Sequence, residues 1–522
     1  MRISTAQFYE SSAANYQKNF ANVVKSSEEA SSLIRVNTAA DDPVGASHLL
    51  QLGQQASMLD QYSANITTIK ATLGTTEAVM TSIGNVLQRA KELALGAGSG
   101  IFTDADRQAN AAELEQIEEQ LLGLMNTKDE SGKYIFAGSK GDTAPFSRNS
   151  DGTYSYNGDQ TTLNLPVGDS MSMATNSTGW EVFQQAINTS RSQTDLAAPA
   201  VDDGRVLLSD GLVSSSANYN NRFRSGEPYT VEFVSSTQFK ITDVKGNDVT
   251  SESSQNGVIS SKDATTQSFS FRGLDLSLNI KLKAGDTDPD AMIAGHSFSL
   301  SSKPDSFNAT RSPGNPSTAQ ITASTVIKPE DYTGSFPAGG AILKFTSASN
   351  YELYASPITA DSKPVSEGSL DGSTAKAAGV DFTLSGAPQA GDQYVIAVNN
   401  HQTQNILDTV SQLRTALLAP VDSDPVLAER FSTELNAGIA NLTSGSEQLS
   451  SALSSVGGRG AALDTQSEAN GSIALANKQT QSAIRDSDPA EVMTRLTLQQ
   501  TMLQASQLAF SKLASLGLFN RL

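Results

Sequence analysis

The sequence predicts an α+β multidomain protein. It has terminal coiled-coil helices, an antiparallel helical-bundle rod and an inserted mainly-β region that contains two similar units. Apolar residues recur at heptad spacing toward both ends of the 522-residue chain. Thirteen of the seventeen prolines lie between residues 145 and 388, and proline is excluded from helix interiors. Short motifs of the middle region recur in the same order further along the chain.

The N-terminal stretch is predicted to be an amphipathic helix that ends near Arg35. Its small and apolar residues alternate at spacings of three and four without a slip, which is the a/d seam of a coiled coil. The seam consists of Ala6, Tyr9, Ala13, Tyr16, Phe20, Val23, Ser27, Ala30 and Ile34. Asp42 as N-cap and Pro43 at the first helical position then begin a second helix.

The second helix is predicted to be very long and to end at the glycine cluster of residues 96–100. No strand precedes this cluster and no GK[ST] follows it, so a helix–helix turn is favoured over a phosphate-binding loop. The stripe of the second helix consists of Leu59, Tyr62, Ile66, Ile69, Leu73, Thr76, Met80, Ile83, Leu87, Ala90 and Ala94. Thr103 is expected to cap a third helix, in which Leu114, Ile117, Leu121 and Leu124 face inward.

The middle region changes to short alternating strands and polar turns. Tyr134, Phe136, Tyr154 and Tyr156 suggest a β-hairpin. Three motifs then recur in order, which predicts two copies of one β unit. Residues 231–233 with 239–241 recur at 343–345 with 351–353, residues 273–278 recur at 379–384, and residues 284–286 recur at 390–392. The polar segment from Ser301 to Lys328 is interpreted as the connection between the copies.

Helical periodicity returns near Thr403, with a restart at Asp424-Pro425 and an expected weak point at Gly457-Gly458. The last helix begins with Asp488 and Pro489, a capping pattern. Its wide apolar stripe has two rows with seven-residue spacing and a residue between them. The rows are Leu496, Leu503 and Phe510, and Met502, Ala509 and Leu516, with Leu513 between.

These patterns define three predicted regions. Residues 1–43 and 486–522 form the terminal coiled-coil region, whose stripes have no other local cover. Residues 44–159 and 401–485 form the helical rod domain with a β-hairpin. Residues 160–400 form the outer β insert, with repeat units at about 222–301 and 335–398. We expect the terminal helices to carry the assembly residues, which are Tyr9, Tyr16, Phe20, Val23, Ile34, Leu496, Met502, Leu503, Ala509, Phe510, Leu513 and Leu516.

Composition excludes several classes of protein. The chain has no cysteine, which excludes disulfides, zinc–thiolate sites and thiol catalysis. The net charge of −19 lies between the two ends, each of which holds three basic and three acidic residues. An acidic body argues against nucleic acid as a partner. No apolar run spans a membrane and no cleavable signal peptide is expected.

The sequence offers no catalytic constellation, so an enzyme is disfavoured and no cofactor or metal is expected. His48, His296 and His401 are isolated, and solvent or turn positions are favoured over ligand roles. Asp286, Asp288 and Asp290 have the first spacing of a calcium loop, but the glycine and glutamate that complete such a loop are missing. An ordinary acidic turn is the favoured interpretation.

Several stretches resemble the bacterial flagellin superfamily, and within it the family of hook–filament junction proteins, the third hook-associated proteins. They are MRISTAQFYESSAANYQ at the start, VNTAADDPVGA in the first turn, GKYIFAGSKGDTAPF with YSYNGD, and TRLTLQQTMLQASQLAFSKLASLGLFNRL at the end. The resemblance covers about residues 1–160 and 400–522.

The resemblance implies a structural subunit of the bacterial flagellum. Such a subunit is exported through the flagellar type III apparatus and forms a ring between hook and filament. Implied partners are further copies of itself, the proximal hook-associated protein, flagellin and an export chaperone that binds a terminal helix. The alternatives are a filament flagellin, although the usual flagellin ends are absent, and a coiled-coil-stalked adhesin whose β repeats bind.

Overall fold

The computed structural model describes residues 2–149, 152–260, 266–283, 285–337, 339–359, 361–422 and 425–519. Side chains are described for these residues except 2–6, 8–9, 330, 425–426 and 513–519. The chain divides into two compact units, which are described separately. Unit 1 comprises residues 1–74, 163–175 and 456–522, and unit 2 comprises residues 75–162 and 176–455. The predicted boundaries near residues 43 and 485 fall at helix ends and those near 160 and 400 in loops, whereas these units divide two long helices part-way along.

The longer helices contain no proline beyond their first residue. They are α1 (Arg2–Ser32), α2 (Pro43–Ala97), α3 (Asp104–Met125), α7 (Ile406–Leu417), α8 (Pro425–Arg485) and α9 (Pro489–Phe519). Thr103 caps α3 in a capping box with Asp106, as predicted for Thr103. The weak point expected at Gly457-Gly458 was wrong, because α8 runs unbroken through 61 residues. Packing along the rest of this long helix outweighs the cost of about 1 kcal/mol for each glycine.

Unit 2 contains a helical core built from α3, α7 and parts of α2 and α8. Its buried side chains include the predicted stripes, among them Met80, Leu87, Leu121 and Leu449. The predicted hairpin is shorter than expected. Strands β1 (Phe146–Arg148) and β2 (Tyr154–Tyr156) pair antiparallel, whereas Tyr134 forms an isolated bridge with Lys128 and Phe136 lies in a turn and in the core. The aromatic residues before Gly138 therefore mark a buried turn rather than a strand.

The β insert contains two units with one strand order. In the first, sheet β10-β9-β13-β6 accompanies sheet β11-β12-β7. In the second, sheet β17-β16-β21-β14, with β18 as an additional edge strand beside β17, accompanies sheet β19-β20-β15. The first unit's strands are β6 (Ser192–Ala198), β7 (Val206–Leu208), β8 (Leu212–Val213), β9 (Tyr229–Ser235), β10 (Gln238–Thr242), β11 (Gln267–Phe271), β12 (Leu274–Ile280) and β13 (Ser297–Ser302). The second unit's are β14 (Ser306–Arg311), β15 (Ile321–Val326), β16 (Ala341–Phe345), β17 (Asn350–Ala355), β18 (Ser366–Ser369), β19 (Thr374–Ala377), β20 (Val380–Leu384) and β21 (Gln393–Asn399).

Equivalent residues of the two units make equivalent contacts. Phe233 pairs with Phe239 across β9 and β10, and Phe345 pairs with Tyr351 across β16 and β17. Gly273 and Gly379 have φ values of +90° and +81°, and a Cβ at either would clash with the backbone of the segment before β9 or β16. Glycine is required at both positions because the backbone is left-handed and closely packed.

Two details of the predicted repeat were wrong. The segment from Ser301 to Lys328 is not a connection, because β14 and β15 of the second unit lie within it. In this segment polar residues alternate with small or isolated apolar residues, so the sequence shows no clear strand pattern for these two edge strands. The partner of residues 390–392 is 294–296 rather than 284–286: Gly295 and Gly391 donate equivalent hydrogen bonds to Phe233 and Phe345. Ala284 lies outside the described residues.

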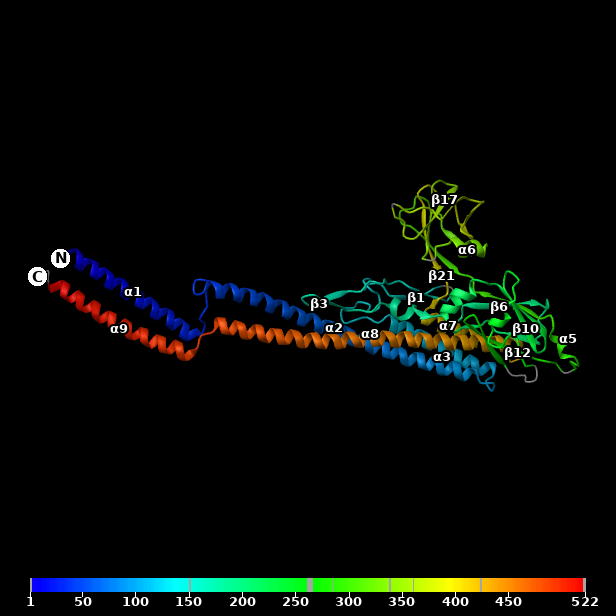
Figure 1. The fold of residues 1–522 in the computed structure, drawn as a ribbon, viewed down its shortest axis with the longest axis horizontal. Coiled ribbons are helices and arrows are strands. Elements are labelled where there is room, and N and C mark those ends of the chain that lie inside the picture. The colour runs from blue at the N-terminus through cyan, green and yellow to red at the C-terminus, as the bar shows by residue number, and fades with distance from the viewer. Residues whose placement is uncertain are drawn as a thin grey trace. The chain divides into compact units, whose positions relative to one another are not determined.

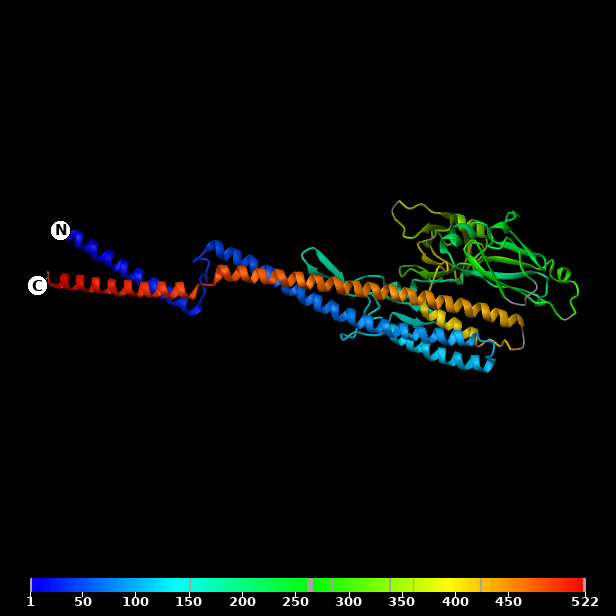
Figure 2. The same ribbon diagram turned by 60° about the horizontal axis from the view of Figure 1, so that its bottom comes forward.

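Unit 1 contains α1, α9, the neighbouring parts of α2 and α8, and the hairpin of β3 (Asn164–Gly168) and β4 (Met171–Ala174). Figures 1 and 2 both show α1 beside α9. The hairpin is held by side chains of the long helices: Asn65 donates to the Pro166 carbonyl at 2.8 Å and Asn470 donates to the Val167 carbonyl at 2.9 Å.

Candidate assembly site

The terminal helices α1 and α9 pair with each other along unit 1. The rings of Tyr16 and Phe510 stack with their centroids 6.2 Å apart. The amide of Asn19 donates to the Ser506 hydroxyl at 2.6 Å. Glu29 forms an ion pair with Arg495 and accepts a hydrogen bond from the Ser487 hydroxyl at 2.6 Å. The pairing therefore combines a few aromatic and aliphatic contacts with polar bonds across the seam.

The segment after α1 attaches the terminal pair to α8. Leu33, at φ +55°, ends α1 and accepts a hydrogen bond from the Ser487 amide at 2.9 Å. The Arg35 amide donates to the Arg485 carbonyl at 2.7 Å, and its guanidinium donates to the Ile484 carbonyl at 2.7 Å. Lys25 forms an ion pair of 2.7 Å with Asp41. The segments that join α1 to α2 and α8 to α9 are therefore bonded to each other.

The predicted a/d seam of α1 is partly wrong. Tyr16, Val23 and Ala30 are at least half-buried, but Phe20 is 52% exposed and Ser27 is exposed. Their places in the seam are taken by the preceding residues, half-buried Asn19 and buried Ser26. The hydrogen bond from Asn19 to Ser506 favours this rotation of the helix over burial of one phenylalanine.

On α9 the two predicted rows separate as expected. Leu496, Leu503 and Phe510 are half-buried against α1. Met502 and Ala509 of the second row are exposed, with Met502 at 51%. Ile34 is half-buried and pairs with Asp486 in an isolated bridge. The predicted side chains of Tyr9, Leu513 and Leu516 lie outside the described residues.

The exposed apolar face of the terminal pair is larger than the sequence indicated. Leu498 and Leu508 on α9 are 56% and 64% exposed, and Val24 on α1 is 41% exposed. Leu498, Met502 and Ala509 have the helical spacing i, i+4 and i+11, which places them on one face. A search for strict seven-residue rows missed Leu498; spacings of three and four would have found it. Large exposed apolar faces mark interaction sites.

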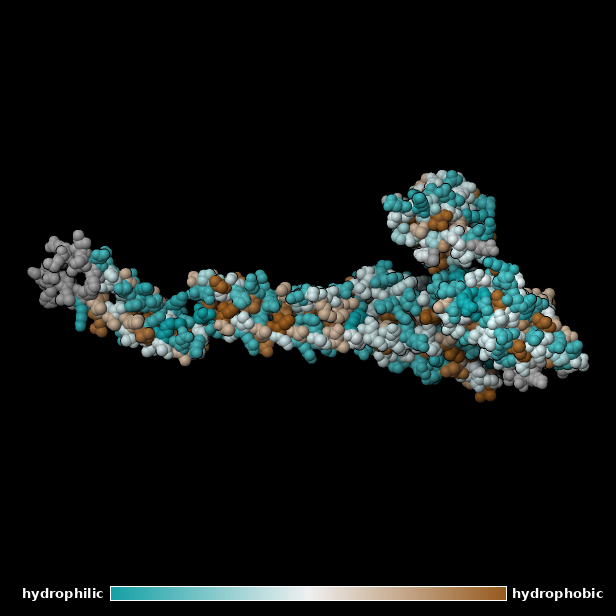
Figure 3. Space-filling model, in the orientation of Figure 1, coloured by the Kyte–Doolittle hydropathy of each residue, from teal (hydrophilic) through white to brown (hydrophobic). Residues whose placement is uncertain are grey.

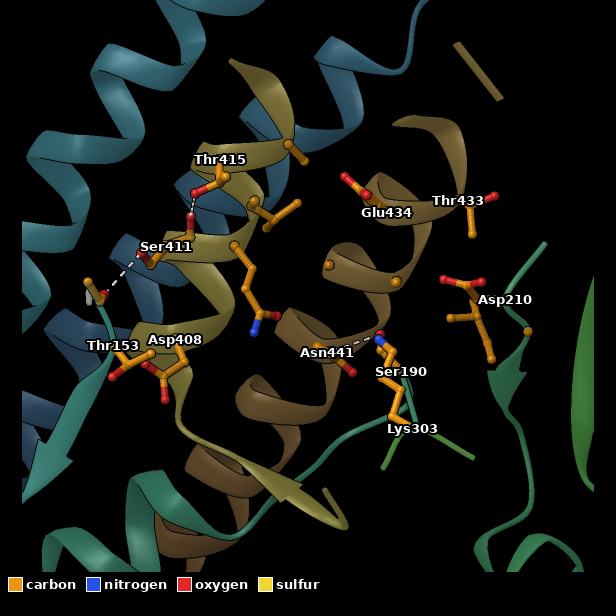
Figure 4. A pocket seen from close by; sticks show the side chains of 18 residues that line it. Thr153, Ser190, Asp210, Lys303, Asp408, Ser411, Thr415, Thr433, Glu434 and Asn441 are labelled. Atoms are coloured by element: carbon orange, nitrogen blue, oxygen red, sulfur yellow. Dashed lines mark hydrogen bonds between the residues drawn. The ribbon is translucent and has the colours of Figure 1, made fainter. Parts of the chain in front are cut away.

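Unit 2 offers a second place to consider, a cleft of about 420 Å³ between α7 and α8. Figure 4 shows Asp408 on α7 and Asn441 on α8, with Asp210 in the loop after β7 and Lys303 directly after β13. Two of its three carboxylates serve the fold, because Asp210 accepts from the Thr194 amide and Asp408 from the Tyr154 amide, each at 2.9 Å. Neither of these hydrogen bonds joins a nucleophilic side chain to a general base.

The histidines and the calcium-like spacing also have structural roles. His296 lies at a turn, one of the two favoured positions, because its amide donates to the Ile293 carbonyl at 3.2 Å. Its side chain is buried, with the ring nitrogens 2.9 Å from the Ile293 carbonyl and 3.1 Å from Asp203. Asp286 pairs with Arg205, and Asp290 accepts from Ser236. Over the part of the chain that is described, three or more His, Cys, Asp or Glu never gather as metal ligands would, and no helix has an apolar run long enough to cross a membrane.

Comparison with known proteins places these helices in a family. The bacterial flagellin N-terminal helical region matches residues 3–141. Flagellar hook-associated protein 3 of Salmonella typhimurium is 31% identical over 195 residues, which are 37% of this chain and 61% of that protein. The protein of the same name from Escherichia coli is 31% identical over 198 residues, 38% of this chain and 62% of that protein. Residues 3–141 of this chain are thus similar to the N-terminal helical region of bacterial flagellins.

The chain spans about three fifths of the length of the curated relatives it matches. Its fold is similar to the crystal structure of flagellar hook associated protein-3 from Legionella pneumophila. The TM-score is 0.52 at 20% identity, over 82% of this chain and 97% of that chain. At this identity the likeness bears on the fold alone. The α+β architecture of terminal helices with an inserted β region agrees with it.

Proposed function

We propose that this protein is a structural subunit of the bacterial flagellum that forms the junction ring between hook and filament. The observation that supports this proposal most strongly is the similarity of the chain to flagellar hook-associated protein 3, at 31% identity. Paired terminal helices with an exposed apolar face support the same role, because a subunit that polymerises needs such a face. The twelve predicted assembly residues remain the proposed contact set, with Leu498 and Leu508 added.

The terminal helices would work by folding coupled to assembly. The chain would leave the cell through the flagellar type III apparatus without a cleaved signal peptide. Outside the cell, other copies, the proximal hook-associated protein and flagellin would cover the exposed face. Before export, a chaperone would bind one terminal helix. This role requires neither catalysis nor a cofactor.

Imaging of flagella from a strain that lacks the gene tests the proposal. We expect hooks to be retained and filaments to be lost, and the full chain to restore filaments. Immunogold label against the β insert should then mark only the joint between hook and filament. Label along the whole filament would identify a filament flagellin instead. Normal flagella in the deletion strain would contradict the proposal and favour a stalked adhesin.

A further inference from the structure

The second β unit has one row of outward side chains that crosses four strands of its larger sheet. Buried and more exposed side chains alternate along β16, β17 and β21, so every second side chain faces outward. Ile342 of β16 lies opposite Tyr354 of β17 on one side and Val395 of β21 on the other. Val395 in turn lies opposite Thr310 of β14. We call these four residues the outer row.

Three of the four residues in the outer row are aromatic or aliphatic, and the row is open to solvent. Val395 is 41% exposed, and Ile342 and Tyr354 are half-buried. The Tyr354 hydroxyl donates to the Glu352 carboxylate at 2.6 Å, which ties the ring to the strand. Figure 3 shows hydrophobic residues in a mainly hydrophilic surface on this unit, whose β17 is labelled in Figure 1. Such exposed side chains forgo the stabilisation that burial would give.

The first β unit has the same sheet with a polar row at the equivalent place. Its strands β10, β9, β13 and β6 occupy the places of β17, β16, β21 and β14. In that order, its register brings together Thr242, Thr230, Ser299 and Asp195. The fold therefore does not require apolar residues in the outer row, and a binding role specific to the second unit accounts for them.

The outer row is too narrow for contact with a folded protein. Four strands at a spacing of about 4.8 Å give a length of about 14 Å, and the next outward residues along each strand limit the width to about 7 Å. The row therefore covers on the order of 100 Å², whereas each partner of a stable protein interface buries about 800 Å². Polar residues follow on both sides, with Lys344 and Gln393 on one and Asn308 on the other. This shape suits a single extended chain.

The groups beside the outer row suit an uncharged chain that carries hydroxyl groups. The carboxylates of Glu352 and Glu367, which lie opposite each other, accept hydrogen bonds. The side chains of Lys344, Gln393 and Asn308 donate them. A cationic peptide would meet the ammonium of Lys344, and an anionic ligand would meet the two carboxylates. A saccharide uses donors and acceptors alike, and the less polar face of its rings packs on aromatic and aliphatic side chains.

We propose that the outer row of the second β unit binds an uncharged oligosaccharide, whose rings pack on Tyr354, Ile342 and Val395. The sugar hydroxyls bond to the polar side chains on both sides of the row. This binding activity goes beyond the proposed junction role and does not depend on it, because the second unit has a core of its own.

Isothermal titration of the full-length monomer tests the proposal, with neutral hexasaccharides of glucose, mannose, galactose and N-acetylglucosamine as probes. We expect at least one of them to bind. Tyr354→Thr combined with Val395→Ser gives the row the residues of the first unit and should weaken binding by at least about tenfold. Val234→Ser is the matched control, at a valine of β9 that is 55% exposed, and should leave binding unchanged. Failure of every probe to bind, or binding that the double variant retains, would overturn the proposal.

Hexalysine is the contrasting probe. Tighter binding of hexalysine than of any hexasaccharide, lost in the same double variant, would overturn the proposal in favour of a cationic peptide. The double variant should still form filaments, so its effect on binding is separate from the junction role.

A second measurement uses the unchanged protein and does not depend on the folding of a variant. The bound hexasaccharide should slow the nitration of Tyr354 by tetranitromethane, measured by mass spectrometry of peptides. Tyr134, which is also half-buried, is the comparison and should react at the same rate with and without the probe. Nitration of Tyr354 at an unchanged rate would contradict the inference.

Discussion

Glu118 is a buried carboxylate in the helical core of unit 2. Its side chain is 1% exposed, accepts from the Arg414 guanidinium at 2.9 Å and from the Tyr154 hydroxyl at 2.5 Å, and lies 3.6 Å from Arg148. Burial is the main cause that raises the pKa of Tyr154, and its hydrogen bond to Glu118 is the second cause. The phenol therefore stays protonated. One carboxylate thus links α3 to α7 and to the β1–β2 hairpin.

We expect Arg414→Met to lower the free energy of unfolding by about 3 kcal/mol, because it removes the main cationic partner of a buried charge. Denaturant unfolding of the variant and of the unchanged protein measures this difference in the free energy of unfolding. Arg89→Met is the matched control: its partner Glu113 and Arg89 itself are 44% and 51% exposed. An exposed pair contributes about 0–1 kcal/mol. Equal effects of the two substitutions would show that Glu118 does not depend on Arg414.

Asp203 supplies a prediction of pH dependence. Burial acts to raise the pKa of Asp203, but hydrogen bonds from the Arg205 backbone and guanidinium and from His296 lower it to about 2. The unfolded value is about 3.9, so this carboxylate stabilises the fold above pH of about 4 and loses that contribution as the pH falls toward about 2.

Asp203→Asn should therefore lower the melting temperature at neutral pH and weaken its fall between pH of about 4 and about 2. Asp195→Asn, at an exposed position of β6, serves as the control. Melting curves recorded across this pH range by circular dichroism provide the measurement. An unchanged acid response would mean that other carboxyls dominate it.

At the scale of the elements, the terminal pair α1–α9 buries few side chains completely. Val492 and Ser26 are its buried residues among the described side chains, and the rest of the seam is half-buried. Burying a large apolar side chain stabilises by about 1.5–3 kcal/mol, whereas ordering one backbone residue costs about 1–2 kcal/mol. The pair has little net stability until neighbours cover its exposed face.

We expect residues 496–516 to exchange their amide protons rapidly in the dilute monomer and slowly in assembled flagella. Hydrogen exchange with mass spectrometry measures both states. Phe510→Asp, which removes the stack with Tyr16, should leave the main melting transition unchanged and abolish incorporation. Strong protection in the monomer would refute coupled folding, and normal incorporation of the variant would refute the assembly role.

At the scale of the whole molecule, the second β unit has its own core. Phe345, Phe382, Leu343 and Tyr394 are buried within it. The chain enters and leaves at one place, because His401 lies 3.1 Å from the Pro304 carbonyl. A deletion of residues 303–400 can therefore be closed without stretching the chain.

We expect this deletion variant to be exported and to support filaments, because the helical core and the terminal pair are left intact. Electron microscopy of the complemented deletion strain is the measurement. Deletion of residues 104–125, which removes α3 from the core, is the contrasting control and should abolish assembly. Loss of filaments on removal of the β unit would show that it takes part in the junction.

Local chemistry explains what the sequence by itself determined. Heptad spacing, the Thr103 cap and the absence of proline predicted the long helices, because helix period and capping depend on residues a few positions apart. The motif repeat predicted two β units of one kind, since alternation and left-handed glycines such as Gly273 and Gly379 are local too. The similarity to bacterial flagellins was recognisable from the helical ends.

The tertiary structure alone decided contacts that join distant residues. Asn19 rather than Phe20 enters the seam because Ser506, far along the chain, accepts its hydrogen bond. Edge strands β14 and β15 became visible only through their pairing with β21 and β20. Burial of Asn470 and Asn477 while Leu50 and Leu475 stay exposed also depends on the partner helix. The spacing of residues along a helix shows which of them share a face. The free energy of packing and hydrogen bonding with distant residues determines which face is buried.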